Sequence, residues 1–297
     1  MRIFDMHIHA EYGDPDSKAL IERMEEVGVY GGTVFSRRPL EALGEPRADY
    51  DTRLRNVFDW CNGFEGRLFP VLWIHADEDC LEDKIRDAAN AGITAFKMIC
   101  DNFYVHDSRV MSALRLISEL EKPIFFHTGI LWDGAVSSEY NKPINWEHLL
   151  KIPDLRFSLA HCSWPWCDEC LAVYGKFLNA YLENPEVSSE MFFDLTPGTP
   201  KIYREELLFK LLNIGYDVPH NIMFGTDSSA ATYGGDWVRG WIKTDNEIYD
   251  KLEVPEKIRE QIFENNFLRF IGKLPKDFTH RLPSPDNGVA WRIEDGI

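Results

Sequence analysis

The sequence predicts an α/β protein whose parallel strands close into a barrel, and two observations support this fold class. Short runs of apolar, β-branched or aromatic residues alternate with amphipathic helical stretches, and eight such runs can be counted. Repeated strand–helix units imply parallel strands with right-handed crossovers, and eight strands form a (β/α)8 barrel of the TIM type. An open doubly wound sheet is the main alternative, but no G-x-G-x-x-G motif follows an early strand.

The expected elements follow one another from the first residues onward. The predicted strands are Arg2–His9, Gly32–Ser36, Arg67–His75, Ile93–Cys100, Pro123–His127, Arg156–His161, Met191–Leu195 and Asn221–Asp227. Helical stretches lie near Ser17–Val27, Tyr50–Cys61, Glu78–Asn90, Trp166–Leu182 and Lys201–Ile214, with one more that Asp107 caps. The length suits one barrel domain over residues 1–297, in which Leu274–Ile297, rich in proline and charge, is a peripheral extended tail.

The composition excludes some classes of partner. The chain has 32 Lys and Arg against 49 Asp and Glu, a formal net charge of −17, so nucleic acid is not an expected partner. No apolar run approaches the ~18 residues of a membrane span and no leader precedes the first strand, so we expect a cytoplasmic protein without a membrane partner. Formation of a homo-oligomer stays open. Cys167 and Cys170 form a C-x-x-C motif without a second ligand pair, so a structural zinc site is not expected.

Two histidines end the first predicted strand. His7 and His9 are two residues apart, so their side chains point to the same face of a strand, whereas Phe4, Met6 and Ile8 are expected to face the helices. Two imidazoles that converge inside a barrel are costly unless they bind something. A divalent cation is the simplest partner.

Three further strands end in residues of metal-binding type. His127 ends the fifth strand, His161 the sixth and Asp227 the eighth. All strand carboxyl ends lie on one face of a barrel, so these three and the two histidines of the first strand are expected to form one cluster. A single histidine at a strand end is more often a hydrogen-bonded core or loop residue, and His75 is interpreted in that way.

These motifs, in this order, resemble those of the amidohydrolase superfamily, and within it amidohydrolase family 2. The matching segments are Asp5-Met6-His7-Ile8-His9, Phe126-His127-Thr128-Gly129, Leu159-Ala160-His161-Cys162, Phe224-Gly225-Thr226-Asp227-Ser228 and a closing helix at 264–272. The resemblance spans nearly the whole chain. It implies a distorted (β/α)8 barrel that holds one or two divalent metal ions, with Zn²⁺ expected and Mn²⁺ as the alternative.

Lys97, on the fourth predicted strand, admits two interpretations. Its segment is similar to the strand of dihydroorotase-like members whose carboxylated lysine bridges two metals, so Lys97 is a metal ligand only if carboxylated. In a one-metal site, a cationic Lys97 would pair with Asp227 or with a substrate carboxylate. A bare buried ammonium is costly, and the sequence leaves both options open.

The ligand set predicts a metal-dependent hydrolase. His7, His9 and His127 would be permanent ligands of a metal that acidifies water and polarises a carbonyl oxygen. Asp227 would accept the proton of the water and return it to the leaving group. His161 would ligate a second metal, stabilise the oxyanion or act as acid or base. No G-x-S-x-G motif is present, which disfavours a serine nucleophile.

The loops after the strands are expected to bind a small-molecule substrate. Tryptophans there would clamp a flat or cyclic substrate, and cationic side chains would pair with its carboxylate. The candidates are Lys97, Trp132, Trp164, Arg204, Trp237 and Arg239. The expected reaction is hydrolysis of an amide, lactone or related bond of a small, cyclic or carboxylate-bearing molecule. The alternatives are a decarboxylase or hydratase acting on an unsaturated or aromatic carboxylic acid, and a non-catalytic metal-binding barrel.

Overall fold

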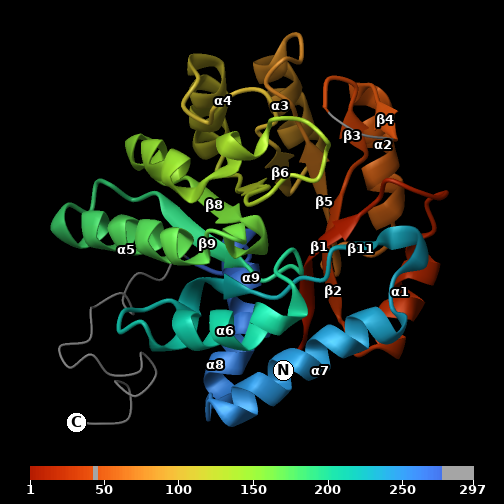
Figure 1. The fold of residues 1–297 in the computed structure, drawn as a ribbon. Helices are drawn as coiled ribbons and strands as arrows, with labels where there is room; N and C mark the ends of the chain where they lie inside the picture. Colours follow the sequence, from red (N-terminus) through yellow and green to blue (C-terminus); the bar gives the residue numbers. More distant parts are fainter. Residues whose placement is uncertain (43–45, 276–297) are drawn as a thin grey trace.

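The fold was determined as a computed structural model, which describes residues 1–42 and 46–275 (Figure 1). One parallel sheet contains nine strands in the order β10-β9-β8-β7-β6-β5-β2-β1-β11. These are β1 (Phe4–His9), β2 (Gly31–Phe35), β5 (Leu68–Trp73), β6 (Ala95–Met98), β7 (Ile124–Phe126), β8 (Arg156–Leu159), β9 (Glu190–Asp194), β10 (Ile222–Met223) and β11 (Ser228–Ser229). A second, two-stranded sheet pairs β3 (Arg38–Pro39) with β4 (Arg47–Ala48).

The two edges of the large sheet belong to one segment of the chain. β10 pairs with β9 and β11 pairs with β1, and between these pairings the Met6 N–H donates to the Phe224 carbonyl at 3.0 Å. β10 and β11 are therefore two pieces of the eighth predicted strand, and the sheet curls round to meet itself. The predicted parallel barrel is confirmed.

Helices pack around the strands (Figure 1). They are α1 (Ser17–Glu26), α2 (Tyr50–Cys61), α3 (Leu81–Ala91), α4 (Ser108–Glu119), α5 (Cys167–Glu183), α6 (Arg204–Asn213), α7 (Gly235–Lys251), α8 (Glu256–Glu260) and α9 (Asn266–Phe270). Short 3-10 segments lie at Ser138–Asn141, Pro143–Lys151, Ala160–Ser163, Lys201–Tyr203, Pro219–Asn221 and Ala230–Thr232, and a π-helical turn lies at Gln261–Asn265.

Local sequence explains where several helices begin. Asp16 accepts a hydrogen bond from Ala19 N at 2.9 Å at the start of α1, and Asp49 accepts one from Thr52 N at 2.8 Å at the start of α2. Asp107 holds the N-cap position of α4 without a side-chain capping bond. The sequence prediction had not included α7, which begins at Gly235 directly after Gly234. Both glycines have positive φ angles, and the helix buries an apolar stripe around Val238.

Aromatic side chains fill the interior of the barrel at the amino ends of the strands. Phe267 of α9 stacks on Phe4, the first residue of β1, with ring centroids 4.8 Å apart. Phe270 of α9 contacts Phe125 of β7 and Phe192 of β9, with ring centroids 4.8 and 5.0 Å apart. The closing helix predicted near 264–272 thus plugs this end, and the opposite, carboxyl end carries the cavity described below.

Among the described residues, no helix has both the length and the apolar character needed to cross a membrane. The predicted tail, Leu274–Ile297, lies mostly outside the described residues, which end at 275.

Candidate metal centre and substrate cavity

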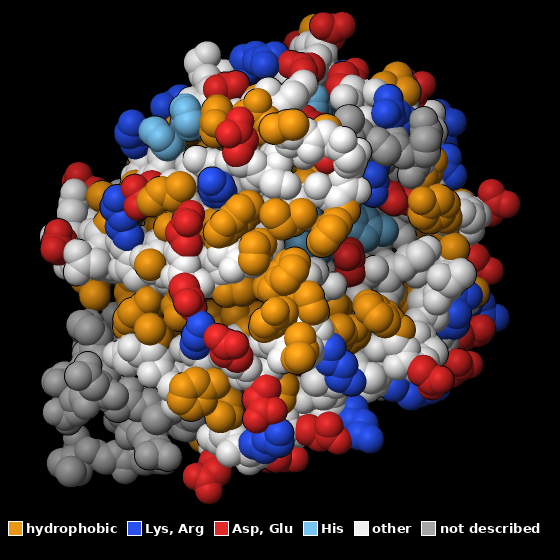
Figure 2. Space-filling view, viewed as in Figure 1, with side chains coloured by type: hydrophobic (Ala, Val, Ile, Leu, Met, Phe, Trp, Pro, Cys, Tyr) orange, Lys and Arg blue, Asp and Glu red, His pale blue; other side chains and the backbone are white. Residues whose placement is uncertain are grey.

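A cavity of about 820 Å³ opens at the carboxyl ends of the strands. Histidine side chains are visible in a recess bordered by hydrophobic side chains (Figure 2). The cavity lining includes all five members of the predicted cluster and the predicted lysine: His7, His9, Lys97, His127, His161 and Asp227. Residues separated by up to 220 positions in the sequence are thus brought to one site, because the strand ends of a barrel converge.

A β-bulge in the first strand sets the direction of its side chains. Asp5 pairs with Gly32 and Ile8 with Val34, so β1 has one more residue than β2 over this stretch. Phe4 and Met6 consequently pack in the aromatic interior of the barrel, whereas Ile8 packs against the surrounding helices. The prediction that Phe4 and Met6 face the helices is wrong, because it assumed an unbroken strand.

Asp5 holds the bulge in place. Its buried carboxylate accepts hydrogen bonds from the backbone N–H of His7 at 3.0 Å and of Thr226 at 3.1 Å. The hydroxyls of Thr226 and Tyr233 donate to the same carboxylate. Burial raises the pKa of Asp5 to about 6, although these hydrogen bonds act in the opposite direction. Asp5 therefore ties the backbone beside one candidate ligand, His7, to the backbone beside another, Asp227.

His7, His9 and Asp227 form a compact group of potential metal ligands. One ligand atom from each residue lies within 4.8 Å of the other two. Nε2 of His9 is 3.0 Å from Asp227 Oδ1, and Nε2 of His7 is 3.5 Å from the same oxygen. Burial alone would raise the pKa of Asp227, but the hydrogen bond from His9 and the neighbouring imidazoles outweigh it and hold that pKa well below its usual value. The carboxylate is therefore ionised near neutral pH.

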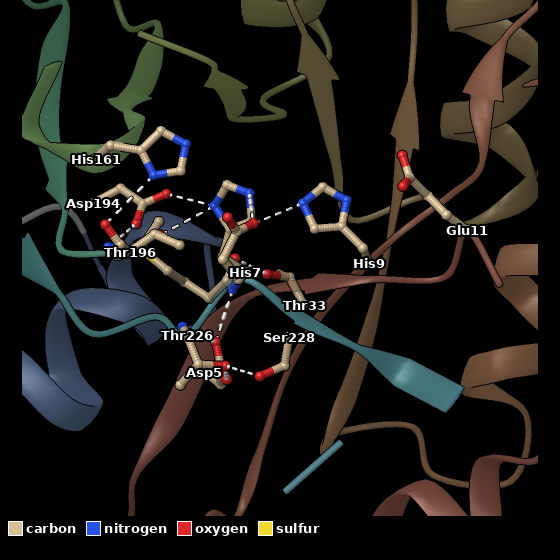
Figure 3. A network of polar contacts seen from close by, with 12 residues as sticks. Asp5, His7, His9, Glu11, Thr33, His161, Asp194, Thr196, Thr226 and Ser228 are labelled. Carbon is tan, nitrogen blue, oxygen red and sulfur yellow. Dashed lines mark hydrogen bonds and ion pairs between the residues drawn. The ribbon is translucent and has the colours of Figure 1, made fainter. Parts of the chain in front are cut away.

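His7 is held from behind by Asp194, the last residue of β9 (Figure 3). Nδ1 of His7 is 2.7 Å from Asp194 Oδ2, and the Thr196 N–H donates to Asp194 Oδ1 at 2.7 Å. A carboxylate acceptor places the imidazole proton on Nδ1, which leaves the lone pair on Nε2 free for a cation. Burial lowers the pKa of His7 well below 6.5 and raises the pKa of Asp194 to about 6. Asp194 was not among the predicted site residues, although an acidic residue at the end of an apolar strand is a usable signal.

His127 and His161 follow the neighbouring strands β7 and β8 and both line the cavity, and their rings meet edge to face with centroids 5.1 Å apart. Nε2 of His127 is 3.3 Å from the Ile130 carbonyl, and Nδ1 of His161 is 3.4 Å from the Thr196 carbonyl. A carbonyl oxygen accepts a hydrogen bond, so the N–H is on Nε2 of His127 and on Nδ1 of His161, and the lone pair is on Nδ1 of His127 and on Nε2 of His161. Burial lowers the pKa of both residues, which keeps them neutral and able to ligate or to accept a proton.

The backbone at His161 is unusual and closely packed. His161, Cys162 and Ser163 have positive φ angles of 60°, 44° and 59°. Non-glycine residues rarely adopt this conformation, and such strain is concentrated at functional sites. A Cβ on Gly198 would lie 2.4 Å from His161 Cγ, so only glycine leaves room for the imidazole there.

Lys97 lies beneath this group on β6. Its residue is 1% exposed, and Nζ lies 5.2 Å from the centre of the Phe35 ring. Burial lowers the pKa of Lys97 to about 8, while Asp194 and Asp227 act to raise it. A partly deprotonated amine is compatible with carboxylation, and the remaining ammonium is compatible with an anionic ligand.

The other predicted substrate contacts fall into two groups. Trp132, which is 81% exposed, and Trp164 line the cavity. Trp237, Arg204 and Arg239 are not among the described residues that line it. Trp237 donates its indole N–H to the Thr226 carbonyl at 2.8 Å and borders a neighbouring groove of about 370 Å³.

Neither predicted arginine reaches the cavity. Arg204 is fully buried and makes two hydrogen bonds, of 2.8 and 2.7 Å, to Asp245. Arg239 lies on the exposed face of α7, 3.8 Å from Asp236. The prediction for Arg204 is therefore corrected, because its charge is neutralised by a partner inside the protein. The cavity lining instead includes Arg38, which is ion-paired with Glu11, and Arg47.

The donor set fits a divalent cation. Neutral imidazoles and an ionised carboxylate are the usual ligands of zinc, and manganese also accepts them. The hydrogen bond from His7 to the carboxylate of Asp194 is also typical of metal-ligating histidines, which donate their second ring N–H to such an acceptor.

Comparison with known proteins agrees with this geometry. The amidohydrolase family model matches residues 4–273. An uncharacterized TIM-barrel protein from Bordetella bronchiseptica has 14% identity and a TM-score of 0.66, with 92% of this chain and 100% of that chain covered. The 2,6-dihydroxybenzoate decarboxylase from Rhizobium has 13% identity and a TM-score of 0.62, with 91% and 99% covered.

A third similar structure is a probable 2-pyrone-4,6-dicarboxylic acid hydrolase from Acinetobacter baumannii, with citric acid bound. It has 13% identity and a TM-score of 0.58, with 92% of this chain and 100% of that chain covered. At these identities the likeness extends to the fold alone. No curated protein matches the chain.

Proposed function

The chain belongs to the amidohydrolase family, and from that premise we propose that it is a metal-dependent hydrolase. It would cleave an amide, lactone or related bond of a small, cyclic or carboxylate-bearing molecule with water. The observation that carries the proposal is the group formed by His7, His9 and Asp227, whose ligand atoms lie within 4.8 Å of one another at the mouth of the barrel. The lyase reaction on the same barrel is kept as the alternative.

His7, His9 and Asp227 would hold the ion, with His127 as a further ligand. A bound Zn²⁺ or Mn²⁺ would supply an acidified water and an electrophile for a carbonyl oxygen. His161 completes a second pair of donors with His127, so two ions can be held only if Lys97, once carboxylated, joins them. One ion needs no modification of Lys97, and we propose the one-ion site as the resting state because the compact group already contains three ligands.

Asp227 and His161 would move the protons. The carboxylate of Asp227 is ionised near neutral pH, so it can accept a proton from water and return it to a leaving nitrogen or oxygen. The lone pair on Nε2 of His161 faces the same cavity, which makes this residue a second acceptor. The hydrogen bond to the Thr196 carbonyl would hold the imidazole in that orientation.

The cavity favours a planar, anionic substrate. Trp132 and Trp164 offer two aromatic side chains at the rim, and the Lys97 ammonium lies on the floor. A carboxylate placed near Lys97 would neutralise a buried charge. The same feature supports the alternative, a decarboxylase or hydratase acting on an aromatic or unsaturated carboxylic acid, and one similar fold is that of a 2,6-dihydroxybenzoate decarboxylase.

Metal content and product analysis test the proposal together. The protein is stripped with a chelator, reloaded with Zn²⁺ or Mn²⁺ and assayed for metal per chain by mass spectrometry. His7→Ala and His9→Ala are expected to lose most of the metal, whereas His106→Ala, a surface histidine, keeps it. Wild-type metal content in both ligand variants would refute the site.

The reaction class is read from products. The loaded enzyme is given panels of cyclic amides, lactones and aromatic carboxylic acids, and Asp227→Asn serves as the inactive reference. Ring opening of an amide or lactone supports the hydrolase, and release of carbon dioxide without ring opening supports the lyase. Turnover that persists in Asp227→Asn would contradict the assigned role of Asp227.

A further inference from the structure

A second polar pair, His75 and Asp101, lies at the cavity but outside the candidate ligand group. His75 follows β5 and is fully buried, and Asp101 follows the neighbouring strand β6 and is 7% exposed. Nε2 of His75 is 3.0 Å from Asp101 Oδ1. Asp101 lines the cavity, whereas His75 lies behind it and is not among the described lining residues. Asp101 shares this wall with Lys97, four residues earlier in the chain.

The backbone fixes the tautomer of His75. The Asp77 N–H donates to Nδ1 of His75 at 3.2 Å, so Nδ1 must carry the lone pair. The ring proton is then on Nε2 and points at Asp101. His75 therefore acts as a fixed neutral donor to Asp101, which remains an acceptor.

The turn that carries this donor is itself anchored. The carboxylate of Asp77 accepts hydrogen bonds from Arg109 of α4 and from Asn102 at 3.4 Å. The backbone N–H of His75 also donates at 2.9 Å to Glu78, which is bound by Arg53. A chain of hydrogen bonds thus runs from the helices around the barrel to one carboxylate in the cavity wall.

A purely structural His–Asp pair would not need this position. A buried carboxylate is stable when several donors reach it, as at Asp5, where four do. Within residues 1–42 and 46–275, Asp101 has only the bond from His75, and its carboxylate borders the cavity. One oxygen is therefore held and the other is available to a ligand, which leaves an acceptor of fixed direction facing the substrate space.

We propose that Asp101 is a specificity-determining residue that accepts a hydrogen bond from an N–H or O–H group of the substrate, and that His75 is its positioning residue. With Lys97 on the same wall, the substrate class is a planar carboxylic acid that also carries a hydroxyl or amino group. The inference rests on the proposed function in one respect, namely that the substrate occupies this cavity. It names a contact that hydrolase and lyase chemistry would share.

The test compares ligands that differ only in a donor. Zinc-loaded protein is titrated calorimetrically with 2-, 3- and 4-hydroxybenzoate and with the three methoxybenzoates, which keep the oxygen but lack the proton. The wild type is expected to prefer at least one hydroxy acid over its methyl ether by about tenfold to a hundredfold, the range of a hydrogen bond to a charged acceptor. Asp101→Asn is expected to reduce this ratio to about one or to invert it, because its amide can donate to the ether oxygen.

Ratios separate the specific contact from a general change in charge. Asp133→Asn removes another negative charge from the cavity lining and is expected to change the affinity of all six acids together, leaving the ratio unchanged. His75→Gln keeps a donor toward Asp101 and should preserve the ratio, whereas His75→Phe should lower it. Rescue by glutamine distinguishes positioning from simple packing.

The outcomes distinguish this inference from the proposed function. Metal content is measured in every variant and is expected to equal that of the wild type, because neither residue is a candidate ligand. Loss of metal in the wild type would overturn the proposed function, and a lost ratio with full metal content in Asp101→Asn supports the inference. An unchanged ratio in Asp101→Asn, or no binding of any of the six acids to the loaded wild type, overturns it.

Discussion

Replacing Asp194 by Asn tests whether the hydrogen bond behind His7 sets the affinity of the site for metal. The bond is 2.7 Å long and joins two groups that are almost completely buried. An asparagine would keep the bond from Thr196 N–H by presenting its oxygen there, and its amide would then face Nδ1 of His7. That contact moves the imidazole proton to Nε2, the nitrogen that faces Asp227.

The expected loss can be estimated from two directions. Removing a carboxylate behind a ligating histidine weakens metal binding about 10- to 100-fold. A hydrogen bond to a charged partner contributes about 1.5–3 kcal/mol, which corresponds to a similar range. Because the tautomer is also reversed, we expect Asp194→Asn to lie near the upper end, with zinc bound about 100-fold more weakly.

Zinc affinity is measured by competition with a chelating dye, so no substrate is needed. Asp217→Asn is the matched control, because Asp217 makes a 2.7 Å contact with Nδ1 of His220 at a position away from the cavity. Both variants must retain the circular dichroism spectrum of the wild type in the metal-free state. A zinc affinity of Asp194→Asn within about threefold of the wild type would refute the assignment of His7 Nε2 as a ligand supported by Asp194.

Three further predictions concern stability and the cavity rim. Arg204→Met should lower the free energy of unfolding in urea by about 3–5 kcal/mol, because it leaves buried Asp245 unpaired. Replacement of an exposed arginine, Arg239→Met, should change this free energy by less than about 0.5 kcal/mol, and equal effects of the two substitutions would contradict this account. In metal-free protein, burial depresses the pKa of His161, so its contribution to stability is present above pH 6.5 and is lost as the pH falls below 6.5. On acidification from pH 7.5 to 5.5, the free energy of unfolding of the wild type should therefore fall more than that of His161→Gln, by up to about 1.4 kcal/mol per pH unit. Trp132→Ala should leave the melting temperature within about 1 °C of the wild type, and calorimetry should show that it binds aromatic acids about tenfold more weakly. Unchanged binding would show that Trp132 does not contact the substrate.

The order of elements and the convergence of the ligands could be predicted because both follow from periodicity and topology. His127 and Asp227 required only that parallel strands end on one side of a barrel. Arg204 could not be judged in this way, since its partner Asp245 lies on α7, a helix absent from the predicted elements. The support of His7 by Asp194 depends on a contact across 187 positions, which no local pattern reports.

In the first strand, the side-chain directions predicted from the sequence differ from those in the structure. A two-residue period places His7 and His9 on one face, and both do line the cavity, but the same rule sends Met6 outward, where it does not lie. An extra residue in β1 changes the period, and the bulge leaves the N–H of His7 in need of an acceptor, which Asp5 supplies.

The same carboxylate accepts the N–H of Thr226, where the eighth strand is interrupted between β10 and β11. Two irregularities in neighbouring strands therefore share one buried side chain, and each of them directs a candidate ligand into the cavity. This double role explains why an aspartate, Asp5, lies two residues before His7. It fixes the separation between His7 and Asp227, so the spacing of the ligand group depends on a residue that does not itself line the cavity.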